Sequence, residues 1–300
     1  MSLLVVGSVA FDSVETPFGK ADRVLGGSAT FFMYAASYFT PQRLVGIVGQ
    51  DFPPEMLKEL ESRGVDLRGL VVDPQGKTFH WTGRYEGDMN AAQTLGVSLN
   101  VLGTWKAKVP DEFRDSEYVF LANDHPRTQL DVLGSVKGNP FSVADTRDFW
   151  VSEEPKLLGE LLQRVDGLVL NEHEARLLSG QSNLVVAGAD ILRRGPEFVV
   201  IKKGEHGALL FSGEGTFAIP ACPLAVVRDP TGAGDAFAGG LMGYLASSGK
   251  RSLEAIRRGL TYGTVTASVA VEDFSVEPFR RVTRQALNDR HDDFLRTIRF

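Results

Sequence analysis

Residues 229–240 carry the clearest chemical signal in this sequence. The run Asp-Pro-Thr-Gly-Ala-Gly-Asp (229–235) places a glycine-lined turn directly before an acid, and the small apolar residues after it predict a helix. Such a turn leaves backbone N–H groups unpaired at a helix N-terminus, where the helix dipole favours an anion such as phosphate. Asp235 would lie in the first helical turn, where it could take a proton from a hydroxyl group attacking that phosphate. The run therefore predicts a site for phosphoryl transfer.

A simpler interpretation of the same run is a tight turn followed by a first-turn acid that the helix dipole favours. The glycines inside the predicted helix, Gly239, Gly240 and Gly243, bear on this choice. Each interior glycine costs a helix roughly 1 kcal/mol relative to alanine, so they indicate a close approach of the backbone to something. Either a ligand or a packed neighbouring element would explain that approach.

The run 229–240 resembles the C-terminal signature of the PfkB, or ribokinase-like, carbohydrate kinases. The resemblance implies that Asp235 is the general base and that the amides of Gly232, Ala233 and Gly234 form an anion hole. It extends over nearly the whole chain. It implies an ATP-dependent phosphotransferase whose acceptor is an alcohol group of a small sugar.

The run Asn-Glu-His-Glu (171–174) follows a predicted strand that ends at Leu170. Ligands of open α/β sheets bind at strand ends, where an amide and an acid could hold Mg²⁺ through water. The run resembles the family's metal and phosphate motif, which implies that Asn171 and Glu174 bind ATP and that Glu174 holds Mg²⁺ through water. An ordinary capping box, with Asn as N-cap and Glu at N3, is the alternative.

A third run, Lys-Gly-Glu-His-Gly (203–207), joins a predicted strand to a probable hairpin turn. In the resembling family a Gly-x-x-Gly turn borders the ATP site, which implies ATP contacts by Lys203, Gly204 and Gly207. A plain β-turn competes with this interpretation. Lys202 and Lys203 could meet ATP phosphates, although two lysines at a strand end are more often solvated.

Asp229 and Thr231 precede the predicted anion hole. They match positions where many family members bind a monovalent cation, so the resemblance admits K⁺ at Asp229, while Thr231 also borders the ATP site. Segment 271–275 would supply the remaining carbonyl ligands. Phe274 and Ser275 replace the usual small residues there, so K⁺ activation is an open question.

The acceptor side of the predicted site lies near the N-terminus. An acid, Asp12, comes shortly after the first predicted strand, and the family uses an acid at this spacing to bind sugar hydroxyls. The run Gly-Gly-Ser-Ala-Thr (26–30) resembles the family's second glycine motif, beside the substrate. The resemblance therefore implies substrate contacts by Asp12, Gly26, Gly27 and Thr30. Phe31 departs from the pattern, because the family often has Asn there.

Further side chains follow other predicted strands. Asn123, Asp124 and Arg147 stand at such positions and could line the same pocket, and Asn123 is the preferred substrate contact among them. Aromatic residues near the substrate end, such as Phe11 and Phe31, could stack on a base or belong to the core.

Short β-branched apolar runs alternate with helix-period segments, which is typical of parallel βαβ units. We therefore expect one α/β domain over residues 1–300, with a mostly parallel central sheet in the three-layer ribokinase-like α/β/α arrangement. The predicted strands are 3–6, 44–48, 118–122, 141–144, 167–170 and 198–201, and the predicted helices are 29–38, 54–62, 154–163, 172–179, 185–194, 235–247, 253–271 and 283–299.

Two segments, 11–24 and 77–99, break this rhythm and are better explained as half-exposed antiparallel strands. In the resembling family such segments form a small β-lid that covers the substrate and often pairs two subunits, which implies a homodimer through the lid. An edge extension of the main sheet is the alternative.

Composition restricts the remaining function classes. With 43% hydrophobic and 23% charged residues, the 300-residue chain has an ordinary globular composition, and no apolar stretch approaches a membrane span. The start of the chain shows no secretory signal, so we expect a cytoplasmic protein without membrane partners. The net charge of -6 gives no broad attraction to nucleic acid. Cys222, the single cysteine, cannot form an internal disulfide.

Two alternative functions stay open at this point. A nucleoside kinase of the adenosine-kinase type would share the fold and the motifs. A non-catalytic regulator that binds a sugar or nucleotide would share the fold, although such a binder has no need of the base Asp235. The sequence contains neither a Gly-x-x-x-x-Gly-Lys-Ser/Thr loop nor a Gly-x-Gly-x-x-Gly run after its first strand, which argues against other nucleotide-binding classes.

Overall fold

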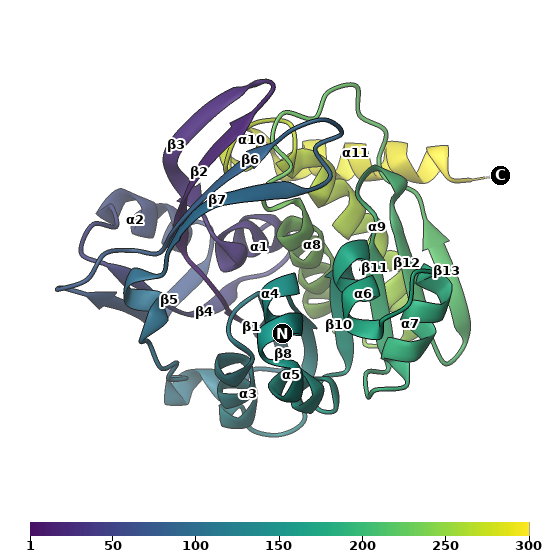
Figure 1. The fold of residues 1–300 in the computed structure, drawn as a ribbon, viewed down its shortest axis with the longest axis horizontal. Helices are drawn as coiled ribbons and strands as arrows, with labels where there is room; N and C mark the ends of the chain where they lie inside the picture. The colour runs from purple at the N-terminus through teal and green to yellow at the C-terminus, as the bar shows by residue number, and fades with distance from the viewer. Residues whose placement is uncertain (300) are drawn as a thin grey trace.

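A large, mostly parallel sheet forms the centre of the molecule (Figure 1). The computed structural model describes residues 1–299. Among these residues the sheet has nine strands in the order β13-β12-β11-β10-β9-β8-β1-β4-β5, and its pairs are parallel except β11–β12 and β12–β13. The strands are β1 (Leu3–Val6), β4 (Gln42–Gly49), β5 (Val65–Asp73), β8 (Tyr118–Leu121), β9 (Phe141–Asp145), β10 (Gly167–Asn171), β11 (Phe198–Lys202), β12 (Ala208–Ser212) and β13 (Gly215–Ile219).

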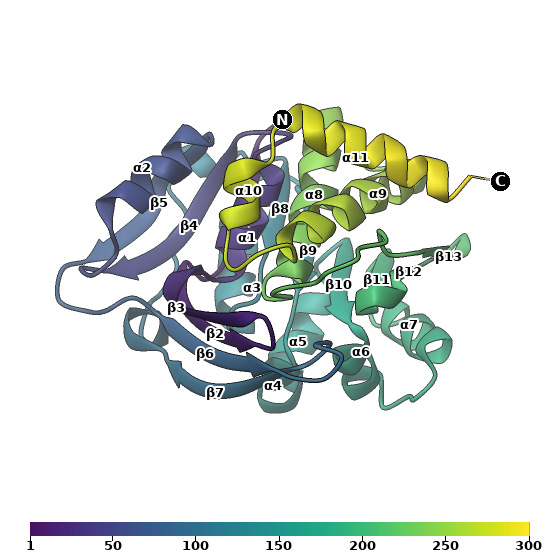
Figure 2. The same cartoon turned by 90° about the horizontal axis from the view of Figure 1, so that it is seen from above.

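Helices cover both faces of this sheet, which confirms the predicted three-layer α/β/α fold (Figures 1 and 2). One layer contains α1 (Ser28–Ala36), α2 (Pro54–Ser62), α8 (Ala233–Ser248), α9 (Leu253–Ala270), α10 (Glu277–Arg281) and α11 (Arg284–Thr297). The other contains α3 (Pro126–Ser135), α4 (Asp148–Glu153), α5 (Pro155–Leu162), α6 (Glu172–Ser179) and α7 (Leu184–Leu192). Each layer has its own cluster of buried apolar side chains against the sheet.

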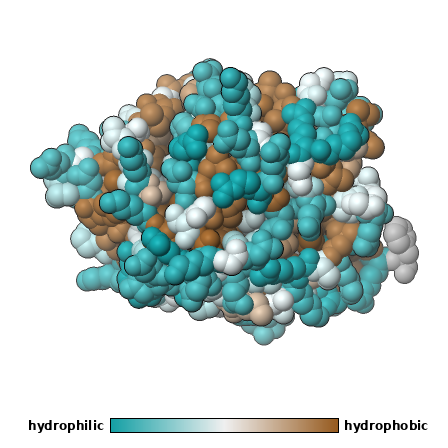
Figure 3. All heavy atoms as spheres, turned by 90° about the horizontal axis from the view of Figure 1, so that it is seen from below, coloured by the Kyte–Doolittle hydropathy of each residue, from teal (hydrophilic) through white to brown (hydrophobic). Residues whose placement is uncertain are grey.

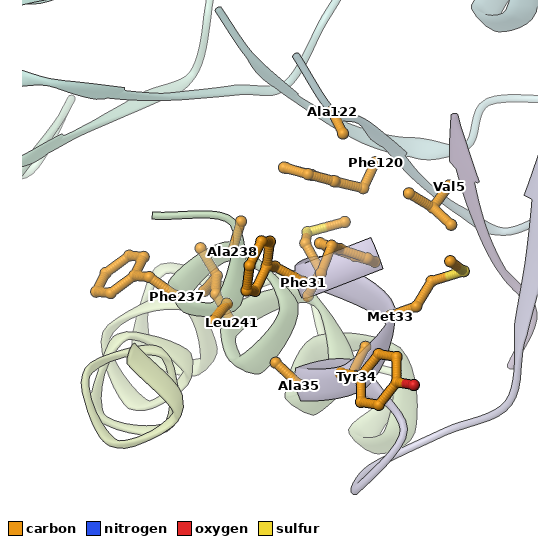
Figure 4. Close-up of a cluster of buried hydrophobic side chains, with 14 of the residues drawn as sticks. Val5, Phe31, Met33, Tyr34, Ala35, Phe120, Ala122, Phe237, Ala238 and Leu241 are labelled. Atoms are coloured by element: carbon orange, nitrogen blue, oxygen red, sulfur yellow. The ribbon is translucent and has the colours of Figure 1, made fainter. Parts of the chain in front are cut away.

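The glycines inside α8 serve helix packing. A Cβ atom added at Gly239 would lie 2.4 Å from the Phe32 carbonyl oxygen of α1, and one added at Gly240 would lie 2.3 Å from Thr266 Oγ1 of α9. Figure 4 shows the resulting cluster, with side chains of α1 and α8 close together. Of the two explanations that the sequence left open, close packing of neighbouring helices therefore accounts for Gly239 and Gly240.

A second sheet of four strands, in the order β3-β2-β6-β7, stands beside the central one and is called the lid sheet below. It consists of β2 (Ala10–Thr16), β3 (Gly19–Gly26), β6 (His80–Tyr85) and β7 (Ala92–Ser98), which Figures 1 and 2 show grouped together. The two hairpins β2–β3 and β6–β7 are antiparallel, but β2 and β6 pair in parallel. The expectation of antiparallel strands is therefore confirmed within each segment, while the pair β2–β6 joins the two segments in parallel.

The predicted elements recur with boundaries shifted by a few residues, whereas several others were missed. Unpredicted elements are β5, β12, β13, α3, α4 and α10. α4 and α10 span only six and five residues, too few for a helical period to stand out. Among residues 1–299, no helix is long and apolar enough to cross a membrane. Figure 3 shows hydrophilic side chains over much of one face, with separate apolar patches between them.

Candidate functional site

A cavity of about 280 Å³ lies at the carboxyl ends of β9, β10 and β11, between the central sheet and the lid sheet. Strand ends of this kind are where open α/β sheets bind ligands. The cavity brings together residues from distant parts of the chain that the sequence singled out. These are Asp12, Gly27, Asn123, Arg147, Asn171, Glu174, Thr231, Gly232, Gly234 and Asp235.

The glycine-lined turn forms the N-terminus of α8, as its sequence predicts. Gly232 is the N-cap and has a φ of 74°, in the left-handed region that favours glycine. The Ala233 N–H donates to the Pro230 carbonyl oxygen at 3.2 Å, so it is engaged in the turn itself. Within residues 1–299, the N–H groups of Gly232 and Gly234 have no hydrogen-bond partner. Of the three amides expected in the anion hole, these two remain available to an anion in the cavity.

Phe31 lies beneath this turn. Its side chain is 1% exposed, and a Cβ atom added at Gly232 would lie 2.1 Å from a carbon of its ring. In Figure 4 the Phe31 side chain, from α1, points toward α8 near Ala238. The residue that departs from the family pattern therefore packs against the glycine turn and also lines the cavity.

Asp235 lies in the first turn of α8 and faces the cavity together with Lys202 and Asp145. The Lys202 Nζ atom donates to Asp145 Oδ2 at 3.0 Å, and both side chains are largely buried. Burial raises the pKa of Asp235 well above its ordinary value, and the nearby Asp145 carboxylate adds to this. Of the two interpretations that the sequence left open for Lys202, the structure does not show a solvated side chain, because its partner Asp145 comes from another strand, β9.

Asn171 and Glu174 form the capping box that was the alternative explanation of their motif. The Glu174 N–H donates to Asn171 Oδ1 at 2.8 Å, and the Asn171 N–H donates to Glu174 Oε2 at 2.7 Å. Both residues also line the cavity. Burial, with a contribution from Asp145, raises the pKa of Glu174 to about 8. The pair thus caps α6 and presents polar atoms to the cavity.

The charges around the cavity suit a bound cation. Four carboxylic acids line it, and only Lys202 and Arg147 bring positive charge. Among residues 1–299, no group of three or more His, Cys, Asp or Glu side chains is arranged to hold a metal ion. The donor set therefore fits a Mg²⁺ ion that keeps water ligands and is held mainly by phosphate oxygens, rather than one enclosed by protein ligands.

Asp12 stands across the cavity, on the lid strand β2. Its side chain is 5% exposed, and burial raises its pKa to about 7, although a hydrogen bond from the Gly27 backbone opposes the rise. A Cβ atom added at Gly26 would lie 2.0 Å from Asp12 Oδ2. Gly26 therefore makes room for the Asp12 carboxyl group, and Gly27 stabilises it.

Three aromatic residues of the cavity, Phe79, Trp81 and Tyr85, were not identified from the sequence. They come from the segment that contains lid strand β6, and Trp81 pairs in register with Asp12 of β2. The Thr231 hydroxyl lies 3.4 Å from the Tyr85 hydroxyl, which links the lid to the glycine turn. Alternating polar and aromatic residues at 78–85 are the only sequence signal that could have found them.

Several predicted contact residues lie outside the cavity. Thr30 is fully buried in α1. Lys203, Gly204 and Gly207 form a tight turn between β11 and β12, in which the Lys203 N–H donates to the Gly207 carbonyl oxygen at 2.7 Å. A Cβ atom added at Gly204 would lie 2.6 Å from Asn90 Oδ1, so this turn meets the loop between β6 and β7.

Asp229 is 1% exposed and lies behind the glycine turn. Its Oδ1 atom accepts a hydrogen bond from the Thr231 N–H at 2.9 Å, and the Ser275 backbone also hydrogen-bonds to it. The Val271 carbonyl oxygen accepts a hydrogen bond from the Arg228 N–H at 2.8 Å. Burial raises the pKa of Asp229, and the Asp273 carboxylate adds to the rise.

The chain is similar to known proteins in sequence and in fold. Residues 4–277 match the pfkB family of carbohydrate kinases. The chain is 34% identical to cytidine kinase from Thermococcus kodakarensis over 271 residues, which cover 87% of this chain and 94% of that protein. It is 38% identical to aminoimidazole riboside kinase from Salmonella typhimurium over 252 residues, 79% of each chain.

The fold also matches a solved structure from Escherichia coli, named as Ribokinase II, in complex with ATP and Mg²⁺. The TM-score is 0.79 at 20% sequence identity, and the match covers 99% of each chain. At this identity the likeness concerns the fold.

Proposed function

Because the chain belongs to the pfkB family of carbohydrate kinases, we propose that it transfers the γ-phosphoryl group of ATP to a hydroxyl group of a sugar or nucleoside bound beside Asp12. Enzymes of this family are phosphotransferases that act on hydroxyl groups of such substrates. The observation that carries the proposal is a single cavity that contains Asp12, Asp235 and the glycine turn. The residues proposed to bind the acceptor and those proposed to bind phosphate thus line one cavity together with Asp235.

In the proposed reaction, Asp235 accepts the proton of the acceptor hydroxyl group. The acceptor oxygen forms a bond to the γ-phosphorus, while the bond from that phosphorus to the β,γ-bridging oxygen breaks and ADP leaves. The N–H groups of Gly232 and Gly234 donate to the oxygens of the transferring group at the N-terminus of α8. The turn therefore stabilises charge where it develops during the transfer.

ATP and Mg²⁺ are the proposed cofactors. Asn171 and Glu174 would hold the Mg²⁺ through water, and the ion would neutralise phosphate charge in a cavity that is rich in carboxylates. The E. coli structure of the same fold contains both ATP and Mg²⁺, which supports this assignment.

Two acceptor classes are compatible with this chemistry, and the aromatic wall favours a nucleoside. Phe79, Trp81 and Tyr85 line the cavity on the lid side, next to Asp12. Aromatic side chains stack on nucleobases, because every base has a π-face. The related cytidine kinase and aminoimidazole riboside kinase are named for acceptors in which a base is attached to ribose. We therefore place the ribose at Asp12 and the base against the aromatic wall.

Asp235→Asn tests the proposal against the alternative of a non-catalytic binder. The substitution keeps the shape of the side chain but removes the base, so we expect kcat to fall by roughly 10²–10⁴-fold. Formation of ADP and of phosphorylated product would be measured with Mg²⁺–ATP and a panel of ribose, fructose, cytidine, uridine, adenosine and inosine.

Circular dichroism and calorimetric titration of ATP serve as controls, and we expect both to match the wild type. Turnover of Asp235→Asn close to that of the wild type would contradict the assignment of the base. A folded wild-type protein that binds ATP but phosphorylates nothing on the panel would instead support the non-catalytic binder.

A further inference from the structure

Lys202 is a cation of the cavity that lies beside the glycine turn. It is the last residue of β11, and its side chain is only 16% exposed. Burying a charged ammonium group is costly unless it is paired. Asp145 Oδ2 supplies one partner at 3.0 Å.

The ion pair with Asp145 leaves hydrogen-bonding capacity on Lys202. An ammonium group has three N–H donors, and within residues 1–299 only the Asp145 carboxylate accepts one. Burial opposes the charged form, but the carboxylates of Asp145 and Glu174 raise the pKa of Lys202 overall. Lys202 is therefore a charged group with donors to spare at the wall of a cavity.

The position of the ammonium group shows which part of the chain lies beside its free N–H donors. A Cβ atom added at Gly234 would lie 2.7 Å from Lys202 Nζ, so the ammonium group lies directly beside the turn whose amides are unpartnered. Any side chain at residue 234 would displace it. The unpartnered amides of the turn and the ammonium group thus lie close together at the N-terminus of α8.

We propose that Lys202 is a ligand of the γ-phosphate of ATP, held toward the glycine turn by Asp145. This inference rests on the proposed function, because it assumes that the γ-phosphate occupies the turn. Lys202 adds a full positive charge to the partial charges of the Gly232 and Gly234 amides. Asp145 is a positioning residue, because it acts through the ammonium group.

Lys202→Met tests this role, since it keeps the length of the side chain and removes the charge. Calorimetric titration would measure Mg²⁺–ATP and Mg²⁺–ADP separately. We expect at least tenfold weaker binding of ATP and a change of less than threefold for ADP, because only ATP has the γ-phosphate. Lys156→Met, at an exposed position of α5, is the matched control and should change neither affinity.

Turnover provides the second readout. Removing one donor to the developing charge typically lowers kcat by about 10²–10³-fold, which we expect for Lys202→Met with an acceptor KM within threefold of the wild type. Lys202→Ala should regain part of this rate when ethylammonium is added, since the small cation can occupy the space of the lost ammonium group. A merely structural role predicts no such rescue.

The outcomes separate this inference from the proposed function. If the Lys202→Met protein binds ATP and ADP with wild-type affinities, the role of Lys202 is overturned, whether or not the protein transfers phosphate. Equal weakening of ATP and ADP would also overturn it, because that pattern indicates a general structural or electrostatic effect. A wild type that transfers phosphate to no acceptor would refute the proposed function, while the ATP and ADP affinities would still decide on Lys202.

Discussion

The contact between Gly232 and Phe31 predicts a large effect of a small substitution. Gly232→Ala adds one methyl group at a residue with a φ of 74°, and that group would lie 2.1 Å from a Phe31 ring carbon. Phe31 is 1% exposed within the core cluster, so its ring has little room to move aside. We expect the substitution to destabilise the protein and to displace the turn that forms the proposed phosphate site.

The magnitude has two parts. Holding a non-glycine residue in the left-handed region costs roughly 1–2 kcal/mol. Forcing an extra methyl group into a packed core costs about 1–3 kcal/mol more. We therefore expect Gly232→Ala to lower the free energy of unfolding by about 2–5 kcal/mol.

Gly180→Ala provides a matched control for the backbone part. Gly180 has a φ of 70° and ψ of 13°, close to those of Gly232, but an added Cβ atom there would meet nothing within 4 Å. It should lose only the roughly 1–2 kcal/mol of the backbone part. In a Phe31→Ala background the clash is absent, so adding Gly232→Ala should also cost only roughly 1–2 kcal/mol.

Urea unfolding of the four variants and the wild type would give these free energies, and steady-state turnover would report on the turn. We expect kcat of Gly232→Ala to fall together with its stability, and kcat of Gly180→Ala to stay near that of the wild type. The reasoning is refuted if Gly232→Ala is as stable as Gly180→Ala and as active as the wild type.

Three further predictions follow from the lid and the turn. Burial raises the pKa of Asp12 from 3.8 to about 7. Between these pH values the carboxyl group of Asp12 is protonated in the folded protein but ionised in the unfolded chain. The protein should therefore lose roughly 3–5 kcal/mol of stability as the pH rises from 3.8 to about 7. Asp12→Asn should remove that loss, as urea unfolding at pH 4 and pH 8 would show; equal losses in both proteins would contradict it. Trp81→Ala should raise the KM for a nucleoside about 5–150-fold, because stacking of roughly 1–3 kcal/mol is lost, and should change the KM for ribose little. Equal changes of KM for both acceptors would argue against a base bound at this wall. Because burial is the main cause that raises the pKa of the Asp229 carboxyl group, a cation beside its charged form would be favourable, so we expect K⁺ to raise the rate above that in tetramethylammonium; equal rates would exclude activation.

The sequence predicted correctly the features that depend on residues close together in the chain. Asn171 and Arg147 were predicted to lie at the edge of the sheet because each follows a short apolar strand. The glycine turn predicted the start of α8. These features depend on residues close together in the chain, whose types reflect burial and backbone conformation directly.

The missed features depend on pairing between distant segments. Lys202 is buried because Asp145 comes from another strand, and Trp81 reaches the cavity because β6 pairs in parallel with β2. The engagement of the Ala233 amide with Pro230 depends on the geometry of the turn, which residue types alone do not specify. In each case the local sequence is compatible with several surroundings, and the tertiary fold selects one.

The two sheets contribute different residues to the cavity. This difference bears on how enzymes of the family change their acceptor. In the proposed function, the groups that bind phosphate come from strand ends of the central sheet and from α8, whereas Asp12, Trp81 and Tyr85 of the proposed acceptor site come from the lid sheet. Substitutions in the lid can therefore alter the acceptor while the phosphoryl-transfer groups stay in place. Relatives named for cytidine and for aminoimidazole riboside are similar to this protein over 87% and 79% of its chain, which is compatible with such a division. If the proposed function holds, selection for a new acceptor would act mainly on the lid strands, while the groups at the strand ends of the central sheet stay unchanged.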